Sequence, residues 1–184
     1  GSPGVSISNS AVGSDVIQGW HVSDVVSLAT SPPALYFGDA DAGDVDFGPA
    51  SGTATTQPFT LPAGACTLTF DLYVETADGD ELTVNAVPTS GTSVTLWRLS
   101  EASPTQQSGV EIEVPLRAWA EQTVRLRWTM TLDEDSTGFG VLVDNVVVSC
   151  PCAWLGCAGD EDCDDGIAGT VELCAGGTCV YAVS

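Results

Sequence analysis

The sequence predicts an all-β fold: an antiparallel β-sandwich followed by a small disulfide-rich C-terminal segment. Two observations support this class. From about residue 31 to residue 150, short runs of alternating apolar and polar residues are separated by Gly, Pro, Asp and Ser, as in strands joined by tight turns. Six of the seven cysteines stand at or after Cys150, in a segment too small to bury a core of its own.

The clearest strand runs from Cys66 to Val74. Every second residue in it is apolar, so one face is expected in the core and the other in water. The same alternation predicts inward rows that would fill two facing sheets. These rows are Leu82/Val84/Ala86, Val94/Leu96, Val110/Ile112/Val114/Leu116 and Val124/Leu126/Trp128/Met130/Leu132.

The last strand of the sandwich is expected from Gly140 to Cys150. It is nearly continuous in valine, which predicts a central strand that is buried on both faces, with Asp144 in its inward row. Cys66 opens the clearest strand and Cys150 closes the last one. Antiparallel pairing of the two strands would bring these cysteines together, so we predict a disulfide between them.

The cysteines predict a disulfide framework and, with it, an extracellular or cell-surface location. Zinc is the alternative, but the spacing contains no C-x₂-C pair and the only histidine, His21, is far away in the sequence. The odd count leaves one cysteine without a partner in the chain, and the connectivity of the tail stays open. The seven are Cys66, Cys150, Cys152, Cys157, Cys163, Cys174 and Cys179.

The chain has 184 residues, which suits one well-buried core and a small appendage. We expect a leader or tag with a possible edge strand over residues 1–17. The sandwich would occupy 18–150 and a cysteine-rich tail 151–184.

The formal net charge is −21, from 25 acidic residues and only four basic ones, all arginine. Such a balance argues against nucleic acid and against an anionic membrane as partners. The sequence has no apolar run of membrane-spanning length, which argues against direct membrane insertion. Cations are the natural counterpart. A soluble surface adapted to salt, or a compositional bias, explains the acidity equally well.

A set of segments resembles the MAM-like jelly-roll domains of bacterial secreted peptidases and adhesins. The resemblance covers about residues 18–150 and implies a jelly-roll sandwich, whereas it says little about function because jelly rolls serve many roles. The segments, in chain order, are Gly19–Val22, Ala34–Asp39, Asp46–Gly48, Gly52–Leu61, Ala118–Arg127 and Val141–Val146.

The tail resembles the cysteine-rich stalk repeats of bacterial surface proteins. The resemblance rests on Cys163–Gly166, followed by Thr170, Cys174, Gly177 and Cys179. Such repeats usually carry another cysteine soon after Asp-Asp-Gly, and Gly169 stands at the matching position. That departure would explain the odd number of cysteines.

Acidic residues in two places suggest a metal site. Asp39, Asp41, Asp44 and Asp46 lie in a Gly-rich loop, and an unpaired Asp144 on an apolar strand would be costly to bury. Calcium takes oxygen ligands from flexible loops, and the jelly-roll resemblance implies a structural calcium at Asp144 with a partner such as Asp39. We therefore expect calcium at Asp39, Asp46 and Asp144. Alternatively, Asp144 accepts backbone N–H bonds at a strand end.

A second acidic run, Asp160 to Gly166, superficially matches an EF-hand loop. With Asp160 in the first position the glycine comes one place late, and with Glu161 in the first position the third ligand would be Cys163. Neither register fits. A solvated acidic turn between disulfides is the preferred interpretation.

Charged residues alternate with apolar ones on two consecutive predicted strands. Arg125 and Arg127 alternate on one, and Glu111 and Glu113 on the strand before it. We expect cross-strand ion pairs between them, worth about 0.2 to 1 kcal/mol each if exposed.

The functional alternative is a surface for a sugar or an acidic ligand. Arg125 and Arg127 would donate hydrogen bonds, and the outward aromatic side chains Tyr73 and Trp97 would offer stacking area.

Catalysis has little support in the sequence. It contains no Gly-x-Ser-x-Gly, no His-Glu-x-x-His and no phosphate-binding loop, and His21 is more consistent with packing or capping. We therefore expect a non-catalytic adhesion or interaction module that binds a protein or glycan at a cell surface. A carbohydrate-binding module of a secreted hydrolase is the alternative, and a glycoside hydrolase with an unmarked carboxylate pair is a remote one.

Overall fold

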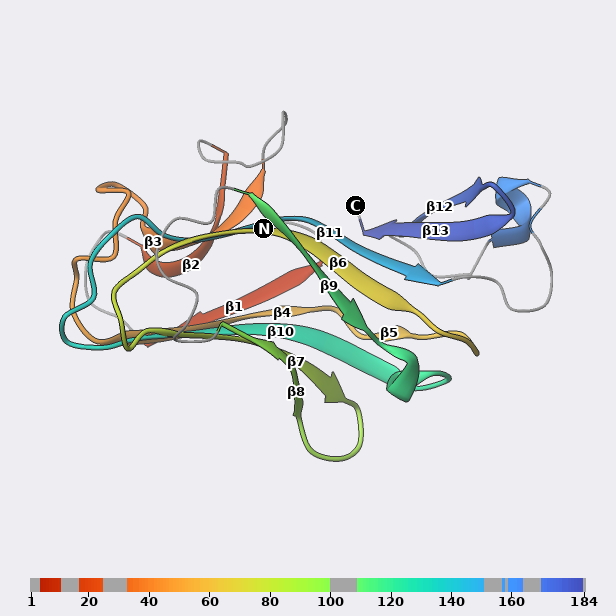
Figure 1. Ribbon diagram of the computed structural model, residues 1–184, viewed down its shortest axis with the longest axis horizontal. Helices are drawn as coiled ribbons and strands as arrows, with labels where there is room; N and C mark the ends of the chain where they lie inside the picture. The colour runs from red at the N-terminus through yellow and green to blue at the C-terminus, as the bar shows by residue number, and fades with distance from the viewer. Residues whose placement is uncertain are drawn as a thin grey trace.

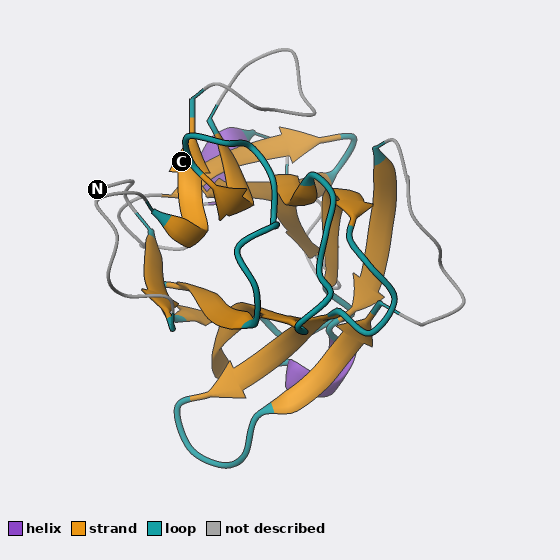
Figure 2. Cartoon of the chain, turned by 90° about the vertical axis from the view of Figure 1, so that its left-hand side faces the viewer, coloured by secondary structure: helices purple, strands orange, loops and turns teal. Residues whose placement is uncertain are grey.

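Two antiparallel sheets face each other across one core in the computed structural model, which describes residues 4–10, 17–24, 33–99, 109–150, 157, 159–163 and 170–183. The all-β sandwich predicted from alternation is confirmed. Figure 2, which looks along the molecule from one end, shows the strands of the two sheets on opposite sides of the core.

Sheet A has the order β1-β4-β10-β7-β8, with the short β5 also paired to β10 (Figure 1). All its described pairings are antiparallel, so its side chains alternate between the core and the outer face. The strands are β1 (Val5–Asn9), β4 (Ala50–Thr56), β5 (Phe59–Thr60), β7 (Glu81–Pro88), β8 (Val94–Arg98) and β10 (Thr123–Leu132).

Sheet B is built around the long strand β11 (Gly140–Cys150), the last strand expected from the sequence. One edge of β11 pairs with β6, which in turn pairs with β9; the other pairs first with β3 and then with β13. The remaining strands are β2 (Gln18–Ser23), β3 (Ala34–Asp39), β6 (Thr67–Glu75), β9 (Val110–Pro115), β12 (Thr170–Ala175) and β13 (Thr178–Val183).

The tail therefore extends sheet B. In the β12–β13 hairpin, Cys179 stands opposite Cys150 and Ala182 opposite Val147, so β13 continues the ladder beyond the end of β3. Figure 1 shows the hairpin beside the last part of β11. The short 3₁₀ helix η2 (Asp160–Cys163) lies against this hairpin. A second 3₁₀ helix, η1 (Arg117–Trp119), joins β9 to β10.

The core contains the inward rows of β6, β7 and β10, as the alternation predicts. Phe70 from sheet B and Trp128 from sheet A meet edge to face with ring centroids 6.0 Å apart, which locks the two sheets together. Burying such side chains fully stabilises the fold by roughly 1.5 to 3 kcal/mol each.

The described part of the chain contains three disulfides. Cys66 and Cys150, the pair expected from strand register, are bonded with their Cα atoms 4.1 Å apart. The two bonds in the tail join Cys157 to Cys174 and Cys163 to Cys179. Cys152 lies outside the described residues.

The expected inward orientation of Asp144 is wrong because β11 contains a β-bulge. The β11–β6 register shifts between Asp144 and Val147, and Asn145 adopts a left-handed φ of 49°. The extra residue reverses the alternation. Val143 before the bulge and Val148 after it both face the core, whereas Asp144 is buried on the outer face of sheet B.

Candidate functional site

Two of the expected calcium ligands, Asp39 and Asp144, lie apart on sheet B, and Asp46 lies in the loop between β3 and β4. Asp144 follows Val143, which stands opposite Leu35 in β3, whereas Asp39 lies at the far end of that strand. At about 3.3 Å per residue, five residues place the two backbones about 16 Å apart. The structure therefore does not bring Asp39 and Asp144 to one site.

Asp39 closes the turn that follows β3. Its carboxylate accepts the backbone N–H groups of Asp41 at 2.9 Å and Ala42 at 2.8 Å, and the amide of Gln18 at 3.1 Å. The Ala42 hydrogen bond, followed by that from Gln18, lowers the pKa of Asp39 below its usual value. This carboxylate is accordingly part of the turn architecture.

The other two acidic groups also accept backbone N–H bonds. Asp46 accepts from Gly138 at 3.3 Å, and Asp144 accepts from Asn145 at 2.8 Å. Among the described residues, the one close group of three potential metal-ligating side chains is Cys157, Cys163 and Cys179, and all three are disulfide-bonded.

The tail acidic run also serves local structure. Asp160 accepts the backbone N–H of Cys174 at 2.8 Å, and Asp162 accepts that of Gly159 at 3.3 Å. Residues 164–166 of the run lie outside the described residues.

The four residues expected to form a ligand surface lie apart, on the outer faces of two different sheets and against the core. Tyr73 lies on the outer face of sheet B, where its hydroxyl donates to Glu75 at 2.7 Å and its ring packs against Phe139. The bond to Glu75 raises the pKa of Tyr73. Arg125 and Arg127 alternate with the core row of β10 and therefore point outward from sheet A.

Trp97 points inward, so its expected outward orientation is wrong. A bulge between β7 and β8 places Trp97 opposite the core residue Val84 and Thr95 opposite Asn85. The Trp97 ring packs edge to face on Phe70, with centroids 6.1 Å apart. Simple alternation along β8 misses this extra residue, as it misses the one in β11.

The expected ion pairs between the arginines and glutamates are also wrong. Glu111 and Glu113 lie on β9, which pairs with β6 in sheet B, whereas Arg125 and Arg127 lie on β10 in sheet A. The consecutive strands β9 and β10 cross from one sheet to the other through η1. The two arginines therefore face away from the glutamates.

The structure instead shows a polar surface across four strands of sheet A, which the sequence analysis did not predict. We call the outward side chains of β4, β10, β7 and β8 the sheet A face. Strand register places them in two rows across the four strands, each about 14 Å long at the usual strand spacing. The rows are Thr55-Arg127-Asn85-Thr95 and Thr53-Thr129-Thr83-Arg98.

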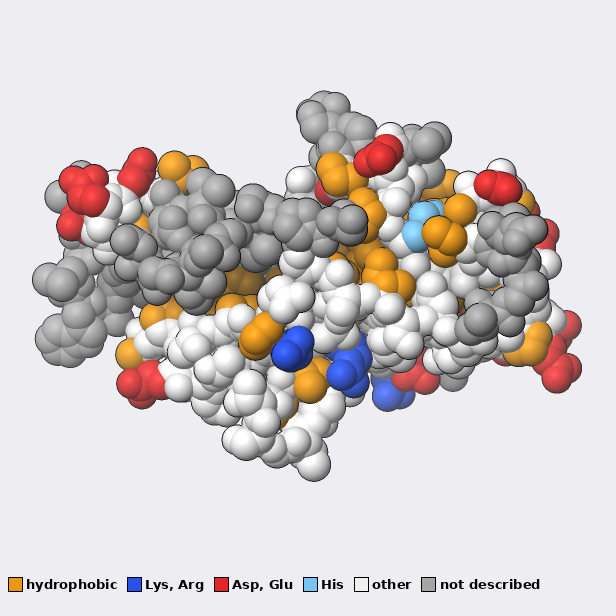
Figure 3. Space-filling view, turned by 180° about the vertical axis from the view of Figure 1, so that it is seen from behind, with side chains coloured by type: hydrophobic (Ala, Val, Ile, Leu, Met, Phe, Trp, Pro, Cys, Tyr) orange, Lys and Arg blue, Asp and Glu red, His pale blue; other side chains and the backbone are white. Residues whose placement is uncertain are grey.

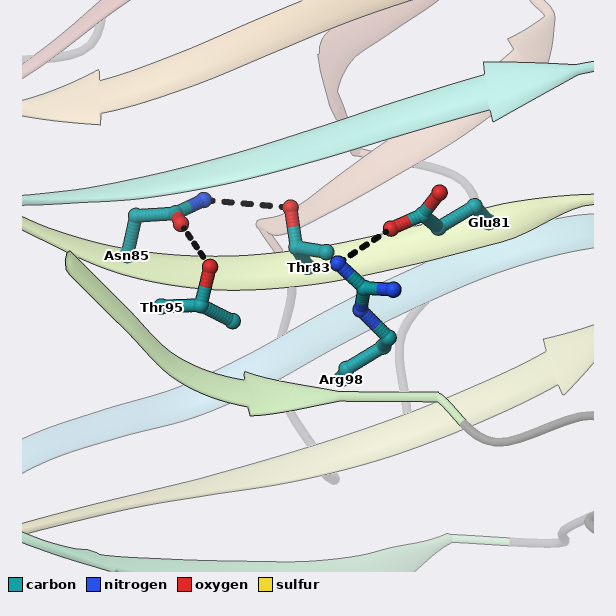
Figure 4. A network of polar contacts seen from close by, with 5 residues as sticks. All are labelled: Glu81, Thr83, Asn85, Thr95 and Arg98. Atoms are coloured by element: carbon teal, nitrogen blue, oxygen red, sulfur yellow. Dashed lines mark hydrogen bonds and ion pairs between the residues drawn. The ribbon is translucent and has the colours of Figure 1, made fainter. Parts of the chain in front are cut away.

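Hydrogen bonds hold part of the sheet A face in place (Figure 4). Asn85 donates to Thr83 at 3.1 Å and accepts from the Thr95 hydroxyl at 2.9 Å, while Arg98 forms an ion pair with Glu81 at 3.1 Å. Figure 3 shows basic side chains gathered among largely uncharged surface in the lower part of the view. The surface combines hydroxyl, amide and guanidinium groups.

The single histidine, His21, contacts a backbone carbonyl and a tyrosine ring. His21 Nδ1 lies 3.0 Å from the carbonyl oxygen of Gly19, and the ring packs edge to face on Tyr36. Tyr36 is buried, which raises its pKa, and its hydroxyl donates to the Phe139 carbonyl.

Within the described ranges, no helix has the length and apolar character needed to cross a bilayer.

No protein-family model matches the sequence, and a search of curated proteins finds no match. Solved structures do show the same fold. TmCBM61, solved with β-1,4-galactotriose, is 14% identical over 80% of this chain and 88% of its own, with a TM-score of 0.53. The K1 cleaved adhesin domain of Lys-gingipain from Porphyromonas gingivalis W83 is 15% identical over 80% and 94%, with a TM-score of 0.52. Identities this low establish the fold alone.

Proposed function

We propose that this chain is a non-catalytic extracellular binding module of a larger protein and that it binds a glycan through the sheet A face. The observation that carries the proposal is the two-row array of side chains across β4, β10, β7 and β8. A sugar presents hydroxyls that both donate and accept, and such an array offers matching partners along about 14 Å.

The mode of binding follows from the face's composition. In the part of the chain that the structure describes, the aromatic residues Trp97 and Trp128 of sheet A point into the core. Recognition would therefore rest on hydrogen bonds more than on ring stacking. The fold it shares with TmCBM61 and the gingipain adhesin domain supports a binding role.

The disulfides and the family resemblances support the wider setting. Three disulfides in a chain of this size favour an oxidising, extracellular location. A MAM-like jelly roll followed by a stalk-type repeat would suit projection from a surface protein. A histidine-dependent hydrolase is disfavoured because His21 is engaged with Gly19 and Tyr36, away from the sheet A face.

Structural calcium remains part of the proposal for the loop that carries Asp39 and Asp46. Because Asp144 lies far from Asp39, the proposed calcium site no longer includes Asp144 and is confined to the loop. Calorimetry with millimolar calcium and with EDTA tests it. A rise in melting temperature that Asp46→Asn abolishes would support a calcium site there, and identical melting curves would contradict it.

Glycan-array binding followed by calorimetry tests the main proposal. Thr129 stands in the middle of the face, between Thr53 and Thr83, so Thr129→Val removes one hydroxyl with little change in shape. Loss of one neutral hydrogen bond is expected to weaken binding about two- to tenfold.

A matched control is available on the other sheet. Thr69 lies on the outer face of sheet B, opposite Glu113, and is half-buried like Thr129. Thr69→Val should leave glycan affinity unchanged. Equal loss in both variants, or no glycan bound at millimolar concentration by the folded protein, would contradict the proposed function. Binding of proteins alone would favour the adhesion alternative.

A further inference from the structure

We propose that the sheet A face recognises an acidic glycan, and that Arg125 and Arg127 hold the carboxylate of a uronic acid residue. This inference rests on the proposed function and specifies its ligand class. The arginines on this face differ in whether they form an ion pair. Arg98 is paired with Glu81 at 3.1 Å (Figure 4). Arg125 and Arg127, in contrast, have no ion pair within the described residues.

The two arginines are placed to act together. They stand two residues apart on β10, on the same face, so their Cα atoms are separated by about 7 Å. Side chains of this length can bring both guanidinium groups to one carboxylate. Each guanidinium can bind a carboxylate through two parallel N–H bonds.

Arg127 is already oriented for such a contact. Its Nε donates to the Thr55 hydroxyl at 3.3 Å, and Thr55 is itself buried, with 7% of its surface exposed. This bond fixes one edge of the guanidinium. The two terminal nitrogens make no hydrogen bond to described residues, so their fork stays open to a ligand.

The local charge favours an anion despite the acidity of the chain. The residues directly opposite the pair are Val87, Asn85 and Thr55, and none carries a negative charge. Two guanidinium groups brought to one site would repel each other, a cost that a bound carboxylate would offset. The sequence has 25 acidic residues and four arginines, so it is unusual that two of the arginines have no acidic partner among the described residues.

A glycan fits this surface better than a dense polyanion. Nucleic acid carries a charge every 1.7 Å along the duplex axis and would be repelled by a net charge of −21. A uronate residue in an oligosaccharide presents an isolated carboxylate together with hydroxyls. The arginine pair would take the carboxylate, while Asn85, Thr95 and their neighbours would contact the hydroxyls.

Isothermal titration with matched ligands tests the inference. The probes are trigalacturonate and trimannuronate, each beside its fully methyl-esterified, uncharged form. We expect the acids to bind at least about tenfold more tightly than their esters, the size expected for one lost charged hydrogen bond. Arg125→Gln and Arg127→Gln should each remove most of that difference, and Arg127→Lys should restore part of it because it keeps the charge without the fork.

Arg117→Gln is the control, since it removes the same charge from the exposed turn η1. It should leave the acid-to-ester ratio unchanged, and melting curves should show that every variant is folded. Equal affinity for acids and esters, or an equal effect of Arg117→Gln, would overturn this inference while leaving glycan binding intact. Failure of all glycans, neutral and acidic, would overturn the proposed function as well.

Discussion

Removal of the Cys66–Cys150 disulfide should unfold this protein at a much lower temperature. The bond joins the start of β6 to the end of β11, across a sequence separation of 84 residues, and both cysteines are buried. Both cysteines are replaced with alanine. A single Cys66→Ala substitution would leave a free Cys150 only two residues from Cys152, where disulfide exchange would be easy.

The expected magnitude follows from the length of the closed loop. In the chain-entropy treatment, a loop of this length contributes about 4 to 5 kcal/mol to the free energy of unfolding. For a domain of 150 to 250 residues, each kcal/mol shifts the melting temperature by roughly 2 to 4 °C. The double variant should therefore melt about 10 to 15 °C lower.

Urea denaturation and calorimetry measure both quantities. Replacing Cys157 and Cys174 is the control, because that bond spans only 17 residues and lies in the tail. The same treatment gives about 3 kcal/mol for this shorter loop, so the main transition should shift by no more than about two-thirds as much. The reasoning would be refuted by a loss below about 1 kcal/mol in the Cys66/Cys150 variant, or by alkylation of Cys66 in the unreduced wild type.

Three further substitutions test the assignments of individual side chains. Trp97→Ala should cost about 2 to 4 kcal/mol in urea denaturation without changing glycan affinity, because Trp97 packs in the core. Tyr36→Phe should cost about 1 kcal/mol at neutral pH. Burial raises the pKa of Tyr36, so wild-type stability should fall above pH 10, where the unfolded phenol ionises first, and the variant should lack this fall. Hydrogen bonding, chiefly from Ala42, lowers the pKa of Asp39, so the wild type's advantage over Asp39→Asn should hold above about pH 4 and vanish in denaturation curves measured at lower pH.

Alternation identified the core because most strands keep it strictly. Leu68, Phe70 and Val74 in β6 are all buried, as a period of two requires. The two wrong orientations, Asp144 and Trp97, both lie next to a β-bulge. A bulge adds one residue and reverses the faces of everything beyond it, and neither bulge is marked by glycine in the sequence.

Sheet membership could not be read from the sequence. Period two tells which residues share a face of one strand, but the partner of that strand depends on contacts distant in the chain. Glu113 and Arg125 are only twelve positions apart, yet they lie on the outer faces of different sheets. The polar rows of the sheet A face arise only when β4, β10, β7 and β8 are placed side by side.

Salt dependence separates two opposing effects on an acidic ligand at the sheet A face: repulsion by the net negative charge of the molecule and attraction by Arg125 and Arg127. At about 10 mM salt the screening length is about 30 Å, so an acidic oligosaccharide is repelled by much of a molecule with net charge −21. At about 150 mM that length falls to about 8 Å, and the ligand responds mainly to Arg125, Arg127 and their uncharged neighbours. The affinity for trigalacturonate should therefore rise between these concentrations and fall again near 1 M, where the arginine contacts are screened too. The methyl ester should show a flat titration series. A steady fall in trigalacturonate affinity from the lowest salt would mean that the acidic surroundings do not oppose the arginine pair, which contradicts this reasoning.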